Sequence, residues 1–182
     1  GIKPLSNDMN LIFVIGSPMS GTTALGKVLG SHESCVTAEE SLFLLSLWQD
    51  FSDRVLGNNR FSKIFLGAYT SPQKALGYMG EYASHFYNDL LDTKSSAKYA
   101  VDHTPWYGYI TDFIHLLFPN AIFVHIIRHQ KDAISSLKNT VKATGGEWGQ
   151  DNDESRKKLR RLMIKESKTI SFKKPAQYLE VS

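Results

Sequence analysis

The first strongly patterned part of the chain is an apolar run at residues 11–15, which leads directly into a loop and a helix. The run reads Leu-Ile-Phe-Val-Ile, is rich in β-branched residues, and predicts a strand buried on both faces. Residues 16–23 contain two glycines, one proline and four hydroxyl side chains, which predicts a loop. Apolar residues then recur at helical spacing, at Ala24, Leu25, Val28 and Leu29. The expected order is therefore strand, loop and helix.

Further apolar patterns predict the elements that follow. Short apolar runs predict strands at 99–101 and 121–127. Apolar residues three or four positions apart predict helices at 41–48, 73–91, 108–118 and from Asp132 onward. The apolar residues within 51–72 follow neither a helical nor a strand spacing, so we expect a loop with short helical pieces there.

Length and composition fit one globular domain. At 182 residues the chain is long enough for a sizeable core, and we expect a single α/β domain over residues 1–182. The charge balance, 21 Lys and Arg against 18 Asp and Glu, argues against nucleic acid as a partner. The single Cys35 cannot form an intrachain disulfide and favours a reducing compartment, so we expect a cytoplasmic protein. The apolar runs are shorter than the roughly 20 residues that cross a bilayer, so no transmembrane segment is expected.

The loop at 16–23 has the composition of an anion-binding loop. The first turn of the next helix presents unpaired backbone N–H groups and the positive end of the helix dipole. Gly16 and Gly21 let the backbone approach an anion. The two glycines have the spacing of an ATP-binding phosphate loop, but Thr22 stands where that loop requires lysine. We expect a phosphate-bearing ligand other than ATP or GTP, with a plain strand-to-helix turn as the alternative. Four side chains can donate further hydrogen bonds to an anion: Ser17, Ser20, Thr22 and Thr23.

The end of the strand at 99–101 carries a candidate base. Pro105 ends the extended segment, which places His103 where open α/β sheets bind their ligands. An imidazole can take the proton of an acceptor hydroxyl near neutral pH. Asp102 precedes it, but adjacent residues of a strand point to opposite faces, so we do not expect Asp102 to support His103 directly. A loop histidine without a role is the alternative.

Arg128, at the end of the strand at 121–127, is a candidate phosphate ligand. Its guanidinium offers a fixed fork of charged donors, and Ser136, on the helix that Asp132 opens, can add a hydroxyl. A salt bridge to a neighbouring acid is the alternative for Arg128. Glu39 and Glu40 precede the helix at 41–48, where acids complement a helix N-terminus.

Residues 17–25, SPMSGTTAL, resemble the loop of sulfotransferases that use 3′-phosphoadenosine 5′-phosphosulfate (PAPS). In that family a P-[KR]-S-G-T-T core holds the 5′-phosphosulfate. The resemblance therefore implies that Met19 and Gly21 bind the cofactor together with the four hydroxyl residues of the loop. Met19 departs from the pattern, because the family has a lysine or arginine there that neutralises developing charge. The resemblance implies a P-loop-like three-layer fold with a central parallel sheet flanked by helices. The matching residues are Pro18, Ser20, Gly21, Thr22 and Thr23.

A second sulfotransferase signature lies at 118–136. In the family, its arginine and serine bind the 3′-phosphate of PAPS, and these positions fall on Arg128 and Ser136. Two separate signatures in the right order are much more specific than either one. The matching residues are Phe118, Pro119, Ala121, Arg128, Asp132 and Ser136.

The family resemblance also implies two candidate bases. Residues 102–107, DHTPWY, closely resemble a segment, E-K-T-P-x-Y, that many sulfotransferases carry. Cytosolic small-molecule members instead carry T-H-x-P there, with the histidine as catalytic base, and alignment on Pro105 places His103 at that histidine. The segment after the first helix resembles one whose glutamate is the base in other branches. Glu39 stands there, with Glu40 beside it if the register differs by one. The choice between His103 and Glu39 stays open.

We therefore expect a PAPS-dependent sulfotransferase. It would transfer a sulfuryl group to a hydroxyl, less often an amine, of a small-molecule or carrier-bound acceptor, without a metal. The product of PAPS is 3′-phosphoadenosine 5′-phosphate (PAP). Met19 leaves open a weakened or inactive domain that binds PAPS or PAP, and a P-loop phosphotransferase that uses ATP is the third alternative. Residues 177–182 resemble a family strand that precedes further helices, so we expect a domain incomplete at its C-terminus or lacking internal stretches.

Overall fold

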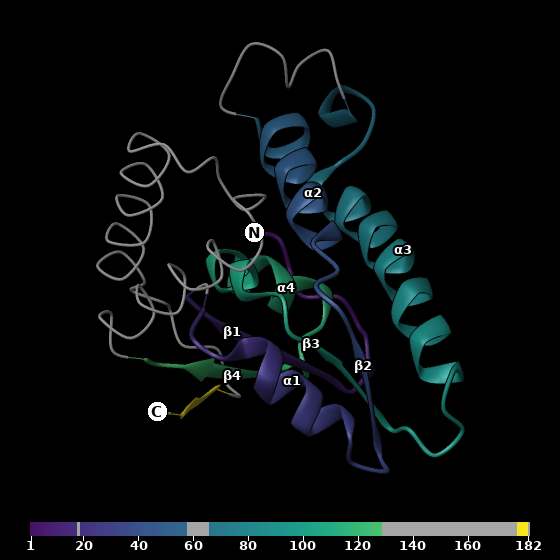
Figure 1. The fold of residues 1–182 in the computed structure, drawn as a ribbon. Helices are drawn as coiled ribbons and strands as arrows, with labels where there is room; N and C mark the ends of the chain where they lie inside the picture. The colour runs from purple at the N-terminus through teal and green to yellow at the C-terminus, as the bar shows by residue number, and fades with distance from the viewer. Residues whose placement is uncertain (18, 58–65, 129–177, 182) are drawn as a thin grey trace, which may run out of the picture.

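The computed structural model describes residues 1–17, 19–57, 66–128 and 178–181, and its centre is a parallel sheet (Figure 1). Within these described residues the sheet has five strands in the order β2-β3-β1-β4-β5, and every neighbouring pair is parallel. Parallel pairing brings the carboxyl ends of all the strands to one edge, where α/β proteins bind ligands. The strands are β1 (Leu11–Gly16), β2 (Cys35–Ala38), β3 (Tyr99–Asp102), β4 (Ile122–Ile126) and β5 (Tyr178–Val181).

Helices cover both faces of this sheet, which confirms the expected α/β fold with helix, sheet and helix layers. On one face, α1 packs on the small apolar cluster that contains Val14 and Val101. On the other face, α2, α3 and α4 pack into a larger core around Phe13 and Ile15. The α-helices of the described part of the chain are α1 (Thr22–Gly30), α2 (Phe43–Asp50), α3 (Pro72–Asp92) and α4 (Thr111–Leu117).

The double coverage explains the continuous apolar run of β1. Successive side chains of a strand point to opposite faces. Phe13 and Ile15 are therefore buried in the larger core, and Val14 between them is buried in the smaller one. A polar residue in either set would lose its water without gaining a partner. This is why β1 can serve as the central support of the loop that follows it.

Most expected elements are confirmed, and the differences have local causes. The helix expected at 73–91 is α3, which Ser71 caps by accepting a hydrogen bond from the Lys74 N–H at 3.3 Å. The helix expected at 108–118 begins instead as a 3₁₀ turn (Pro105–Ile110) and becomes α4 only at Thr111. α2 continues into a π-helical turn, Phe51–Leu56, in the stretch expected to be mostly loop.

β2, a four-residue strand that pairs with β3, was not predicted by the apolar pattern. Ser136 and the helix expected from Asp132 lie outside the described residues. Within the part of the chain that the structure describes, no helix combines the length and the apolar character needed to span a membrane.

Candidate functional site

The loop after β1 is a tight turn that ends at the N-terminus of α1. The Ser20 N–H donates to the Ser17 carbonyl at 3.0 Å, and the Leu25 N–H donates to the Gly21 carbonyl at 3.0 Å. Gly21 has a φ of 106°, in the region that favours glycine, and it caps α1. Met19 has a φ of 66°, which is uncommon for a residue with a side chain. Thr22 is buried at the start of α1, whereas Thr23 is exposed.

Ser20 gives this loop an unused donor. Its side chain is buried, and its Oγ has no hydrogen-bond partner within the described residues. A Cβ added to Gly16 would lie 2.7 Å from this Oγ and 2.8 Å from the Ile126 carbonyl oxygen, so only glycine fits between the loop and β4. A buried hydroxyl without a partner costs about 1–3 kcal/mol, unless a ligand accepts its hydrogen bond. The loop therefore fits a ligand with acceptor oxygens.

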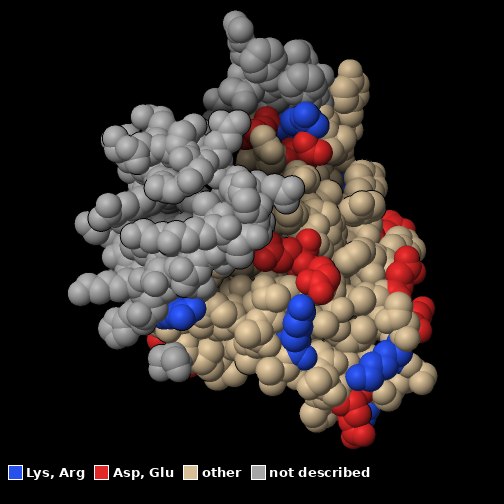
Figure 2. Space-filling model, in the orientation of Figure 1, with Lys and Arg blue, Asp and Glu red and all other residues tan. Residues whose placement is uncertain are grey.

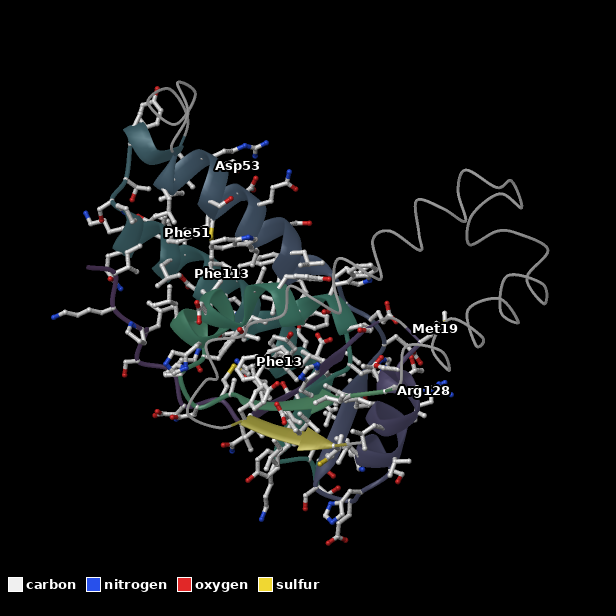
Figure 3. The ribbon with its side chains drawn as sticks, turned by 90° about the vertical axis from the view of Figure 1, so that its left-hand side faces the viewer. Phe13, Met19, Phe51, Asp53, Phe113 and Arg128 are labelled. Atoms are coloured by element: carbon white, nitrogen blue, oxygen red, sulfur yellow. The ribbon has the colours of Figure 1, made fainter. Side chains whose placement is uncertain are left out.

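Arg128 joins the end of β4 to this loop. Its Nη1 donates to the Met19 carbonyl at 3.0 Å, and Figure 3 shows the two residues side by side. The register explains the contact, because Gly16 at the end of β1 pairs with Ile126 near the end of β4. Two segments far apart in the sequence thus meet at one point of the sheet edge.

His103 lies at the end of β3, against α1. A Cβ added to Gly26 would lie 2.6 Å from both Cβ and Cγ of His103, so the absent side chain makes room for the imidazole. The residue is buried, and neither ring nitrogen has a hydrogen-bond partner in the described parts of the chain. Gly26 is the middle residue of α1, so His103 lies against the helix that the loop opens. An imidazole held in this way can exchange a proton with a bound ligand.

Glu39, the other candidate base, is a neighbour of His103. Its Oε2 is 3.8 Å from His103 Nε2, which is beyond hydrogen-bond distance, and its side chain is 80 % exposed. Partial burial raises the pKa of Glu40, the nearby His103 lowers it, and the Asp102 and Glu39 carboxylates raise it further. Figure 2 shows a group of acidic side chains near the centre of one face of the molecule. The two bases that the sequence left open are therefore close enough to affect one another.

Asp102 lies on the opposite face of the sheet from His103, as the alternation of a strand requires. Its Oδ2 accepts from Ser41 Oγ at 2.6 Å and from the Tyr87 hydroxyl at 2.9 Å. Its Oδ1 accepts from the Thr104 N–H at 3.1 Å and from Thr104 Oγ1 at 2.7 Å. Burial raises the pKa of Asp102, and these hydrogen bonds lower it in part. Ser41 Oγ is also 2.6 Å from the Tyr107 hydroxyl, so the cluster ties the end of β3 to α3, to the segment before α2 and to the 3₁₀ turn.

Replacing Asp102 with alanine is expected to lower the free energy of unfolding by about 3 kcal/mol, because buried donors of Thr104, Ser41 and Tyr87 lose their acceptor. For a chain of this size, the melting temperature should fall by about 6–12 °C. Urea unfolding measures the change. The matched control, Tyr87→Phe, removes one hydrogen bond of the cluster and should lower the free energy of unfolding by about 1 kcal/mol. Equal losses in the two variants would contradict the assigned role of Asp102.

The structure thus groups the predicted site residues in two places along one sheet edge. Met19, Ser20 and Gly21 lie with Arg128 at the ends of β1 and β4, and Glu39 lies with His103 at the ends of β2 and β3. Ser136 falls outside the described residues. Sequence reasoning missed the hydrogen-bond cluster of Ser41, Tyr87 and Tyr107. Its only signal in the sequence was an aspartate at the end of a buried strand.

Comparisons with known proteins identify the family to which this chain belongs. The sequence model of the Sulfotransferase family matches residues 11–182. The Nodulation protein NoeE of Sinorhizobium fredii is 24 % identical over 132 residues, which cover 71 % of this chain and 31 % of that protein. An uncharacterised protein of Aquifex aeolicus is 27 % identical over 139 residues, which cover 76 % of this chain and 18 % of that one. The chain thus spans about a third or less of the length of these curated relatives.

A solved structure supports the same fold. The sulfotransferase domain from the curacin biosynthetic pathway superposes with a TM-score of 0.53 at 15 % sequence identity. The match covers 97 % of this chain and 68 % of that domain. At this identity the likeness concerns the fold alone.

Proposed function

Because this chain belongs to the sulfotransferase family, we propose that it transfers a sulfuryl group from PAPS to a hydroxyl of a small-molecule or carrier-bound acceptor. The observation that carries the proposal is the 3.0 Å hydrogen bond from Arg128 to the Met19 carbonyl. It brings the anion-binding loop and the arginine together, as one nucleotide with phosphates at both ends requires. The free thiol of Cys35 is buried and suits a reducing compartment, so we place the protein in the cytoplasm.

Several residues would hold the nucleotide in this proposal. The loop residues Ser17, Met19, Ser20, Gly21, Thr22 and Thr23 would bind the 5′-phosphosulfate, mainly through backbone N–H groups and the unpaired Ser20 hydroxyl. Arg128 and Ser136 would bind the 3′-phosphate. Backbone donors and basic side chains can stabilise the charge of the transition state without a metal ion.

When bound, PAPS supplies the sulfuryl group, whose bond to the phosphate oxygen breaks as the bond to the acceptor oxygen forms. A base on the protein must take the proton of the acceptor hydroxyl. His103 is favoured, because its ring nitrogens are buried and have no hydrogen-bond partner among the residues that the structure describes, whereas the Glu39 carboxylate is largely exposed to water. Glu39 remains a neighbour that can stabilise the protonated imidazole.

Calorimetric titration tests the proposal through nucleotide binding. PAP is expected to bind at least about tenfold more tightly than AMP, because hydrogen bonds to the charged 3′-phosphate are added. ATP with Mg²⁺ is the control ligand and should bind more weakly than PAP, since Thr22 replaces the lysine of ATP-binding loops. Equal affinities for PAP and AMP would contradict the assignment of the 3′-phosphate site. Labelled PAPS offered with alcohols, phenols, amines and glycans would then identify the acceptor.

One feature of the loop favours a second candidate function. Residues 16–23 contain no lysine or arginine, and removal of one preorganised donor from a developing charge lowers rates by about 10²–10³. A sulfotransferase-like domain that binds PAPS or PAP with weak or absent turnover is therefore the alternative. It predicts PAP binding without transfer to any acceptor in the panel.

A further inference from the structure

A cation from outside the loop reaches the loop backbone. The loop at 16–23 has no basic side chain of its own, although its glycines, hydroxyl groups and helix N-terminus suit an anion. Arg128 places its guanidinium on this loop through the hydrogen bond to the Met19 carbonyl. We propose that Arg128, besides its role at the 3′-phosphate, supplies positive charge to the anion held in the loop, and so also serves the 5′ end of the nucleotide. The identity of the nucleotide rests on the function proposed above.

The geometry around Arg128 fixes it to the loop in two ways. The left-handed conformation of Met19 presents its carbonyl to the Nη1 of Arg128. Gly16 keeps the loop in close contact with the Ile126 carbonyl, two residues before Arg128. A guanidinium has five N–H donors in one plane, so a bond to Met19 leaves further donors for a ligand.

Ser20 provides independent evidence that a ligand belongs in this loop. Its side chain is more than nine-tenths buried, and its Oγ lacks a partner within the described residues while lying over Gly16 inside the turn. The backbone N–H groups at the start of α1 face the same turn. A buried hydroxyl without a partner in the described residues, the N–H groups of a helix N-terminus and a guanidinium meet at one turn, and together they match the oxygen atoms of a phosphate or sulfate.

Lys27 is the other basic residue close in sequence, and its position is less suitable. It lies in the last turn of α1 and is exposed, whereas the loop precedes the first turn of that helix. Lys27 therefore serves as a control rather than as a rival cation. The same exposure makes Lys27→Ala a conservative change for folding.

The experiment compares AMP and PAP, because AMP has the 5′-phosphate but lacks the 3′-phosphate. Calorimetry gives both affinities for the unaltered protein, Arg128→Ala, Arg128→Lys and Lys27→Ala, and circular dichroism checks that each variant folds. Arg128→Ala is expected to weaken the binding of AMP by about tenfold or more, as is typical for losing a hydrogen bond to a charged group. The binding of PAP should weaken by at least the same factor, because PAP also loses the contact of Arg128 with its 3′-phosphate. Arg128→Lys keeps the positive charge but lacks the planar set of guanidinium donors, so it should lose less nucleotide affinity than Arg128→Ala. Lys27→Ala should match the unaltered protein.

The outcomes separate this inference from the proposed function. If Arg128→Ala weakens the binding of PAP but leaves the affinity for AMP unchanged, the arginine serves the 3′-phosphate alone. The inference is then wrong, while the proposed function stands. If the unaltered protein binds AMP and PAP equally and Arg128→Ala weakens both, the inference stands and the PAPS assignment is wrong. If the unaltered protein binds neither nucleotide, both are overturned.

Discussion

Replacing His103 with alanine is expected to lower kcat by about 10²–10⁴, the usual contribution of a positioned general base, and to leave the affinity for PAP unchanged. The imidazole is buried at the end of β3 and its nitrogens have no partners in the described residues, so it is available to an acceptor hydroxyl. Initial rates with labelled PAPS and the acceptor found in the panel measure kcat. Calorimetry with PAP shows whether the nucleotide site is intact.

Glu39→Gln is the matched comparison for His103→Ala. Because the Glu39 side chain is 80 % exposed and lies 3.8 Å from the imidazole, its loss should lower kcat by less than about tenfold. The reverse ranking, a large loss in Glu39→Gln and a small one in His103→Ala, would make the glutamate the base. Either ranking resolves the choice that the sequence left open.

Two glycine substitutions test whether the position of the His103 imidazole, and not only its presence, matters for catalysis. Gly26→Ala should displace His103, because the new Cβ would lie 2.6 Å from its Cβ and Cγ, and so should lower kcat while the histidine is retained. Gly77→Ala, on α3, has no atom within 4 Å of the added Cβ and should stabilise the protein by about 0.5–1 kcal/mol without changing kcat. An unchanged kcat in Gly26→Ala would show that the imidazole position is not critical.

The sequence predicted those parts of the fold whose signals are local. The run at 11–15 must be apolar on both sides because β1 is covered on both faces, so its pattern alone identified a buried strand. Gly16 and Gly21 identified the turn, since one lies against Ile126 and the other adopts a positive φ. These constraints act within a few residues, and a single sequence records them directly.

Other features depend on partners far away in the sequence. β2 has four residues and no clear apolar pattern, and it becomes a strand through its pairing with β3. Asp102 was predicted to face away from His103, but its partners Ser41 and Tyr87 come from other elements that a pattern search does not connect. The contact of Arg128 with Met19 likewise follows from the β1–β4 register. The sequence pointed to both residues, Met19 for the 5′-phosphosulfate and Arg128 for the 3′-phosphate, but not to the contact between them.

That contact changes the expected consequence of the missing basic residue at position 19. If the guanidinium of Arg128 already brings a positive charge to the loop, a lysine at position 19 would add a second cation to a site that has one. If Arg128 is removed, the loop at 16–23 retains only neutral donors. The effect of a lysine at position 19 should therefore depend on whether Arg128 is present, which is the behaviour of residues that share one task.

Met19→Lys is accordingly expected to raise kcat by about 10²-fold or more in the Arg128→Ala background, and by less than about tenfold in the unaltered protein. Rates with labelled PAPS and the identified acceptor give the four corners of this double-mutant cycle. Met19→Leu is the matched control, because it keeps an apolar side chain of similar size. It should leave kcat unchanged both in the unaltered protein and in the Arg128→Ala variant. A gain of about 10²-fold in the unaltered protein would instead indicate a weakened enzyme that lacks its loop cation. No gain in either background would show that a side chain at position 19 does not reach the developing charge.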